Sequence, residues 1–293
     1  MSHRSQQRTL WVAALAIPLL LATLALLQMR IDSDATRAAR QDEELLFTSG
    51  PLLKKLSFGY DSLLADVYWT RSIQYYGARI GVRHANFDLL YPLLDVTTTL
   101  DPNLIAAYRF GAIFLSEPPP IGQGRTDLAV QLVKRGIAAN PQDWALHSDL
   151  GFLYYWRLKD YPDAAEQYLE GSNVPGAPAW LRMMAARVAE KGGSIETSRM
   201  IWTEMYQSTK DPKIRKWVLD QLQELTVLDD ETHLDALSEE FRKRVGRYPV
   251  STREIRDAGL LSGIPVDPAG YPYVIGYDGK AHLAPESPAP EPK

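Results

Sequence analysis

The sequence predicts a mainly α-helical protein with an apolar helix near its N-terminus and a small α+β hairpin segment near its C-terminus. Three observations support this prediction. An uncharged run predicts the N-terminal helix, a series of helix-length segments separated by Pro and Gly predicts the helical body, and a Gly- and Pro-rich region after residue 245 predicts the C-terminal segment. The expected parts are a cytoplasmic tail and transmembrane anchor (1–30), a linker and first helix (31–59), helical repeats (60–245), the C-terminal segment (246–283) and a disordered Pro-rich tail (284–293).

The run from Leu10 to Met29 contains 20 residues and no charge. A helix of that length is about 30 Å long, which is enough to cross the hydrocarbon core of a bilayer. A cleaved signal peptide is the alternative, but its apolar part is usually shorter and ends at a small-x-small cleavage site, whereas this run ends in Gln28-Met29-Arg30. We expect an uncleaved, single-pass anchor in a bacterial inner membrane. The short basic N-terminal tail then stays in the cytoplasm and the body lies in the periplasm.

The central part of the chain repeats with a fixed period. Residues 63–77, 104–115 and 144–156 are similar aromatic helix-length segments, and Tyr68 and Tyr108 lie 40 residues apart, as do Gly111 and Gly151. Asn-Pro or Asp-Pro pairs close the intervening segments, at Asp101-Pro102, Asn140-Pro141 and Asp211-Pro212. Self-similarity of this kind is the sequence signature of helical-repeat proteins.

Leu150-Gly151-Phe152-Leu153-Tyr154, followed by Tyr161-Pro162-Asp163-Ala164-Ala165, resembles one tetratricopeptide repeat unit. The resemblance extends over about residues 60 to 225. It departs from the family in its period, which is 40 residues instead of about 34, and in an insertion over 116–124. It implies an α-solenoid of stacked helical hairpins with a concave groove that binds peptides or helices. A non-repeating helical bundle is the alternative.

The resemblance also implies which residues would face a partner. In that family the first helix of each hairpin lines the groove, and the expected partner-binding residues flank its small residue. Tyr and Trp are suited to such a role because they offer large contact area with few rotatable bonds. Packing of the same side chains between repeats is the alternative. The candidate residues are Tyr68, Ser72, Tyr75, Tyr108, Ala112, Phe152, Tyr155 and Trp156.

The C-terminal segment changes pattern. Ser251 and Glu254 have the spacing of a capping box, which predicts a short helix starting at Thr252. A strand near Val274, an Asp278-Gly279 turn and a second strand over 281–283 are expected to form a hairpin.

This segment resembles the C-terminal part of pseudopilins and major pilins, through residues Gly246, Tyr248, Pro249, Asp267, Pro268, Gly270, Pro272 and Tyr273. The chain departs from a pilin because no prepilin cleavage signal precedes its apolar run. In the pilin-like family this region can bind calcium. Asp267 and Asp278 are the only plausible oxygen ligands here, and two carboxylates are too few to predict a metal site.

Composition excludes several function classes. The net charge of -4 gives no basic footprint for nucleic acid, and the absence of cysteine removes thiol chemistry. The five histidines form no i, i+4 pair, and no phosphate-binding glycine motif exists, so neither a metal, a cofactor nor an enzymatic reaction is expected.

The expected function is therefore that of a membrane-anchored scaffold which binds protein partners in the bacterial envelope. The two resemblances imply partners from type IV pilus assembly, type II secretion or a related ABC-transporter system. A structural subunit of a membrane transporter and a hydrolase with an unrecognised site are the alternatives.

Overall fold

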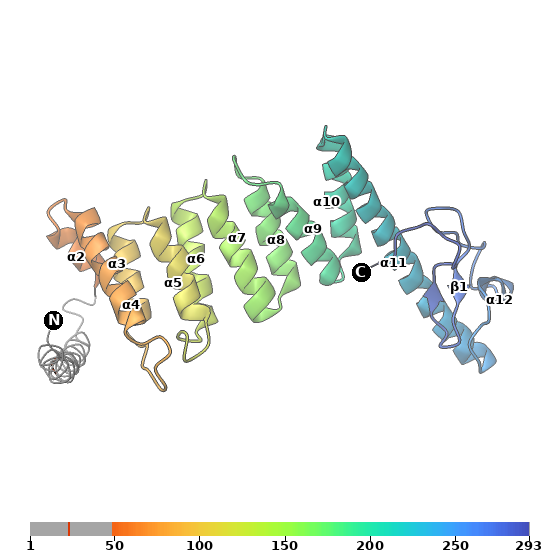
Figure 1. The fold of residues 1–293 in the computed structure, drawn as a ribbon, viewed down its shortest axis with the longest axis horizontal. Coiled ribbons are helices and arrows are strands. Elements are labelled where there is room, and N and C mark those ends of the chain that lie inside the picture. Colours follow the sequence, from red (N-terminus) through yellow and green to blue (C-terminus); the bar gives the residue numbers. More distant parts are fainter. Residues whose placement is uncertain (1–22, 24–48, 293) are drawn as a thin grey trace, which may run out of the picture. The chain divides into compact units, whose positions relative to one another are not determined.

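A computed structural model describes residue 23 and residues 49–292 of the chain (Figure 1). Residues 49–292 contain eleven α-helices, one π-helix and two short strands, which confirms the mainly α-helical prediction. The chain divides into two compact units, Met1–Asn140 (unit 1) and Pro141–Lys293 (unit 2). Within the described part, no helix is both long and apolar enough to cross a membrane. Apart from Thr23, the predicted anchor lies outside the described residues.

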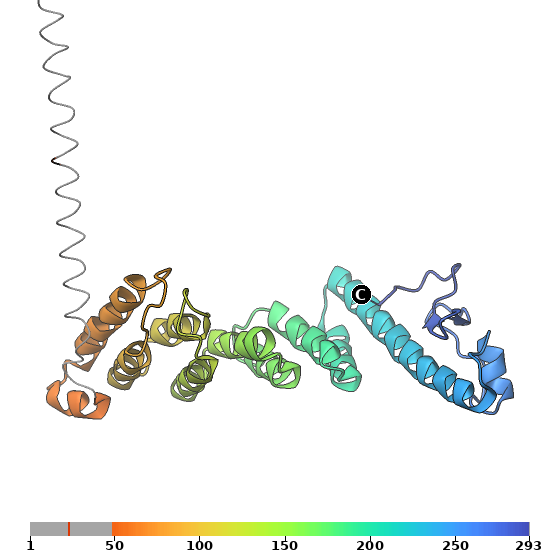
Figure 2. The same ribbon diagram turned by 90° about the horizontal axis from the view of Figure 1, so that it is seen from below.

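In unit 1 the helices follow one another as antiparallel neighbours. α3 packs on α4, α4 on α5, and α5 on α6, while the short α2 packs on α4 (Figure 2). Asp101-Pro102 and Asn140-Pro141 directly follow the ends of α4 and α6, as the sequence pattern predicts, since proline disfavours a helical conformation in the preceding residue. The helices of this unit are α2 (Gly50–Leu56), α3 (Asp61–Gly77), α4 (Leu90–Leu100), α5 (Ile105–Ser116) and α6 (Thr126–Ala139).

Leucines and tyrosines contribute most of the large buried side chains of unit 1. Tyr108 is fully buried, and its ring packs against Gly136, where an added Cβ atom would lie 2.8 Å from the ring. Arg135 of α6 forms an ion pair with Asp95 of α4. These contacts connect helix α6 with its neighbours α4 and α5. The large, fully buried side chains that share this core are Leu90, Leu94, Leu100, Leu115 and Leu132.

Unit 2 continues with the same kind of neighbour packing. α7 packs on α8, α8 on α9, α9 on α10, and α10 on α11. Two helices begin at an aspartate N-cap followed closely by proline: Asp160 accepts a hydrogen bond from the Asp163 amide, and Asp211 accepts one from the Lys213 amide. The helices are α7 (Trp144–Phe152), the π-helix η1 (Leu153–Leu158), α8 (Tyr161–Ser172), α9 (Trp180–Lys191), α10 (Ile195–Ser208), α11 (Pro212–Val245) and α12 (Thr252–Asp257).

The C-terminal residues of unit 2 pack on the second half of α11. β1 (Val274–Ile275) and β2 (Ala281–His282) pair antiparallel around the predicted Asp-Gly turn, and both views place them beside α11 (Figures 1 and 2). Tyr273 is buried against α11, and its hydroxyl donates a hydrogen bond to Asp230 over 2.8 Å. The Ala281 amide donates to Asp235 over 2.7 Å. The hairpin is thus fastened to α11 by apolar packing and by two carboxylates.

One prediction for the C-terminal region needs correction. α12 begins at Thr252 as predicted, but not through a capping box, because the Glu254 carboxylate accepts a hydrogen bond from the Val250 amide and the Ser251 hydroxyl caps nothing. The tail predicted to be disordered (284–293) makes long-range contacts over its described residues. Ser287 hydrogen-bonds to Asp267, and Ala289 packs on the apolar cluster around Tyr273. Local composition, which is typical of disorder, does not predict these contacts.

Candidate partner-binding surfaces

The structure buries five of the eight predicted partner-binding residues. Tyr68, Ser72, Tyr75, Tyr108 and Ala112 are at most 5% exposed and lie in the interior of unit 1. Burial raises the pKa values of Tyr68 and Tyr108 above the ordinary tyrosine value. The prediction that these residues line a groove is wrong, because they pack between helices and offer no surface to a partner.

A different set of α3 and α5 side chains lies at the surface of unit 1. We call Trp69, Ile73, Tyr76, Phe110 and Phe114 the aromatic face. The Trp69 and Phe114 rings stack with centroids 6.4 Å apart, and Tyr76 stacks on Phe114 at 3.9 Å. Phe110 is 52% exposed and Ile73 44% exposed.

The aromatic face is preorganised. Its rings support one another across two helices, so a partner would not need to order them on binding. Sequence reasoning missed these residues, although a signal was present: Trp69, Ile73 and Tyr76 occur at i, i+4 and i+7, and Phe110 and Phe114 at i and i+4.

The remaining three predicted residues lie on or beside η1 in unit 2. Phe152 and Trp156 are each about half exposed, their rings stack with centroids 6.4 Å apart, and Tyr155 lies beside Trp156. Lys159 places its ammonium 4.7 Å from the Trp156 ring, a favourable cation–π arrangement. We call Phe152, Tyr155 and Trp156 the η1 aromatics. Their exposure is compatible with the predicted role.

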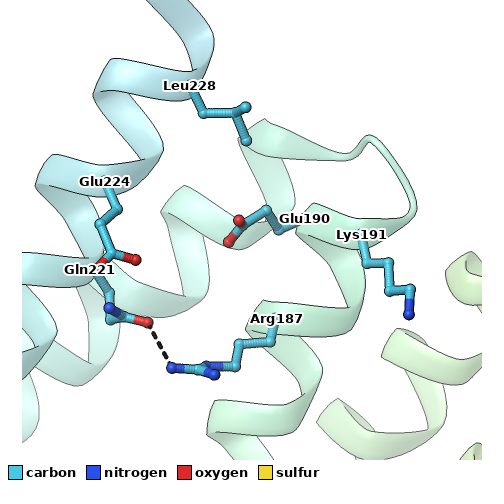
Figure 3. Close-up of a pocket in the computed structure, with 6 residues that line it drawn as sticks. All are labelled: Arg187, Glu190, Lys191, Gln221, Glu224 and Leu228. Atoms are coloured by element: carbon cyan, nitrogen blue, oxygen red, sulfur yellow. Dashed lines mark hydrogen bonds between the residues drawn. The ribbon is translucent and has the colours of Figure 1, made fainter. Parts of the chain in front are cut away.

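A pocket of about 460 Å³ lies between α9 and α11 of unit 2 (Figure 3). Arg187 donates a hydrogen bond to the side-chain oxygen of Gln221 over 3.0 Å, and the Glu190 and Glu224 carboxylates approach the pocket from opposite helices. Its lining residues are Arg187, Glu190, Lys191, Gln221, Glu224 and Leu228.

The pocket is lined by two acidic side chains, Glu190 and Glu224, and two basic ones, Arg187 and Lys191. Burial, and then the neighbouring Glu224, raise the pKa of Glu190 above the ordinary glutamate value, and Arg187 offsets part of this effect. A cationic group placed between Glu190 and Glu224 would relieve their repulsion.

Lys191 connects the pocket with the η1 aromatics. Its ammonium donates a hydrogen bond to the Tyr155 hydroxyl over 2.9 Å and lies 4.8 Å from the Tyr155 ring centroid. This hydrogen bond raises the pKa of Lys191. The pocket and the aromatics are therefore adjacent parts of one surface, which combines apolar, cationic and anionic groups.

The described residues contain no group of three or more His, Asp or Glu side chains arranged to hold a metal ion. Asp267 accepts hydrogen bonds from the amides of Ala269 and Tyr271 and from Ser287. Burial alone would raise the pKa of Asp267, but these hydrogen bonds outweigh it and the pKa lies below its ordinary value. Asp278 accepts from the Lys280 amide in the hairpin turn. Both carboxylates therefore stabilise their own turns.

No protein-family model matches the chain, and no curated protein matches it in sequence.

Proposed function

We propose that this chain is a membrane-anchored scaffold of the tetratricopeptide kind that binds protein partners through aromatic surfaces on its helical hairpins. The observation that carries the proposal is the aromatic face of unit 1. In this face Phe110 and Ile73 are exposed, and Trp69, Tyr76 and Phe114 are partly buried around them. Contiguous aromatic side chains at a surface are typical of the centres of protein interfaces.

The mode of packing supports the α-solenoid part of the proposal. Within each unit, each main helix packs on the next helix in the chain, as expected when neighbouring hairpins bury one another's apolar faces. The period of 40 residues recurs in contacts of unit 1: Arg135 pairs with Asp95, and Tyr91 donates a hydrogen bond to Gln131 over 2.8 Å. Equivalent positions of successive hairpins therefore meet.

The location and the class of partner follow from the sequence. The uncharged run Leu10–Met29 supports a single-pass anchor in a bacterial inner membrane with the body in the periplasm. The resemblance of the C-terminal segment to pseudopilins supports partners from type IV pilus assembly, type II secretion or a related ABC-transporter system. The scaffold needs no catalytic residues and no cofactor.

The first experiment uses the full-length chain in detergent-solubilised membranes. A photo-crosslinking amino acid replaces Phe110, Trp156 or, as a control, the fully exposed Tyr277. Crosslinks from Phe110 or Trp156 to pilus-assembly or secretion proteins support the scaffold. Crosslinks to an ATPase–permease pair alone support a transporter subunit, and substrate turnover by the purified chain would favour a hydrolase.

A paired substitution, Tyr155→Ala with Trp156→Ala, tests the η1 aromatics separately. Because both side chains lie at the surface, partner capture should be lost while the melting temperature changes little. Loss of folding would instead assign these aromatics to the core.

A further inference from the structure

The residues just before and at the start of α3 expose an unusual series of apolar side chains. We call residues 50–63 the foot. Leu52 and Leu56 are each 49% exposed, Phe58 87%, Tyr60 67% and Leu63 60%. The foot thus presents two aromatic and three aliphatic side chains within twelve residues.

Other residues of the foot pack on the rest of unit 1 and hold the segment in place. Leu53 is buried, Gly50 packs against Thr99 of α4, and Lys54 donates a hydrogen bond to the Thr99 carbonyl over 3.3 Å. The Ser57 hydroxyl hydrogen-bonds to Asp61 at the start of α3. The exposed apolar side chains are therefore presented by a fixed backbone.

Phe58 adopts a conformation that a bulky side chain rarely accepts. Its φ is +50°, in the left-handed region, and Gly59 follows with φ +90°. A left-handed backbone conformation disfavours residues with a Cβ atom by roughly 1–2 kcal/mol, and Asn or Asp tolerate it better than Phe. A phenylalanine that is both strained and almost fully exposed contributes little to the stability of the fold, which points to a role outside it.

We propose that the foot is a membrane-docking element, whose apolar side chains insert at the headgroup boundary of the bilayer in which the chain is anchored. Aromatic and aliphatic side chains beside a lysine suit that boundary, where Lys55 would meet anionic headgroups. This inference rests on the membrane anchoring in the proposed function.

The sequence before the foot supports a lipid occupant. Only about 20 residues (30–49) separate the foot from the apolar run that ends at Met29, so a fully extended connection reaches at most about 70 Å. Residues 31–44 of this connection are rich in Asp, Glu and Arg and offer little apolar surface, whereas Leu45-Leu46-Phe47, which come shortly before the foot, continue its apolar character. Apart from Leu45-Leu46-Phe47, the apolar part of the sequence that comes before the foot is the proposed anchor Leu10–Met29, and we assign the bilayer of that anchor as the medium that covers the foot.

The chain contains no cysteine, so single labels can be introduced without background. Full-length protein carrying Ser62→Cys, in the foot, is labelled with an environment-sensitive dye and reconstituted into phosphatidylcholine–phosphatidylglycerol vesicles, with and without lipid-attached quencher. Thr23→Cys, in the apolar run, reports the anchor. Ser262→Cys, an exposed serine in unit 2, is the matched control.

We expect blue-shifted, lipid-quenched emission at positions 23 and 62, and neither effect at position 262. Phe58→Asn with Tyr60→Asn should abolish the quenching at position 62, leave it intact at position 23, and keep the melting temperature. Quenching at position 23 without quenching at position 62 would overturn the docking element and leave the anchor intact.

A blue shift at position 62 that the lipid quencher does not reach would mean that another part of the chain, or a second copy, covers the foot. That result would overturn a lipid occupant. Quenching at neither position 23 nor position 62 would overturn both the anchor and the docking element. Quenching at position 62 alone would support docking and reject the anchor.

Discussion

Phe110→Ala gives the sharpest test of the aromatic face. A phenylalanine side chain can bury about 200 Å², and since 52% of Phe110 is exposed, roughly 100 Å² remains for a partner to cover. At about 25 cal/mol per Å² this area contributes up to about 2.5 kcal/mol to binding, so the substitution should raise the dissociation constant by roughly 70-fold.

The same substitution should cost the fold less than a core substitution does. Phe110→Ala removes only the packed half of the ring, and we expect the free energy of unfolding to fall by about 1–2 kcal/mol. Tyr108→Ala, two residues earlier on α5 and fully buried, should lower it by about 3–5 kcal/mol. The two variants therefore separate the surface of α5 from its core.

The assay is a titration of purified full-length chain with the partner identified by crosslinking, at a temperature where the Phe110→Ala variant is folded. Tyr277→Ala, which removes an exposed aromatic of unit 2, serves as the control and should leave the dissociation constant unchanged. Parent-like affinity of the Phe110→Ala variant would refute the assignment of the aromatic face as a binding surface.

Three further variants test the packing and electrostatics of unit 2. Gly151→Ala should lower the free energy of unfolding by about 1–3 kcal/mol, measured by denaturant titration, because its Cβ atom would lie 2.9 Å from the Tyr168 ring; an unchanged value would contradict that tight packing. Tyr273→Phe should cost about 1.5–3 kcal/mol by removing the hydrogen bond to Asp230, and a neutral effect would show that the hydroxyl contributes nothing. Glu190→Gln should make the chain more stable than the parent at neutral pH, and this difference in stability should disappear at acidic pH. Melting temperatures of both proteins, measured as a function of pH, check this. The raised pKa of Glu190 means that the folded state holds this proton more tightly, so the parent loses stability as pH rises from the ordinary glutamate range to the raised pKa; a pH-independent difference would contradict this reasoning.

The sequence predicted the helices better than the faces they bury. Asp101-Pro102 and Asn140-Pro141 mark helix ends because proline acts on its immediate neighbours, and such local effects are visible in a sequence. Which face of α3 is covered depends on α4, a tertiary contact. Tyr68 and Trp69 are adjacent in sequence, yet about 100° apart on the helix, and only the position of α4 decides which is buried.

Non-local contacts also explain the C-terminal tail. The Pro-rich composition of the tail favours disorder when only neighbouring residues are considered. In the structure, however, the Ser287 hydroxyl hydrogen-bonds to Asp267, twenty residues earlier, and Ala289 packs on the apolar surface beside Tyr273. The hairpin, by contrast, was predictable because its turn is local. Gly279 has a φ of +83°, a left-handed conformation that glycine adopts readily, and its amide donates a hydrogen bond to the Gly276 carbonyl across the turn.

The π-helix η1 gives this chain a place where one residue more or less would change which side chains lie at the surface, while the buried Leu153 and Tyr154 at its start limit where that change can occur. A π-helical turn holds one residue more than an α-helical turn is built for, and a single-residue insertion into an α-helix produces such a segment. Deleting one residue within 153–158 would restore regular α-helix and rotate the side chains beyond the deletion by about 100°. Trp156 would then face a new direction while Leu146 and Leu150, earlier in α7, kept their packing. An insertion or deletion in this segment would therefore re-orient several surface side chains at once, and with them the surface offered to a partner, which a single substitution does not do.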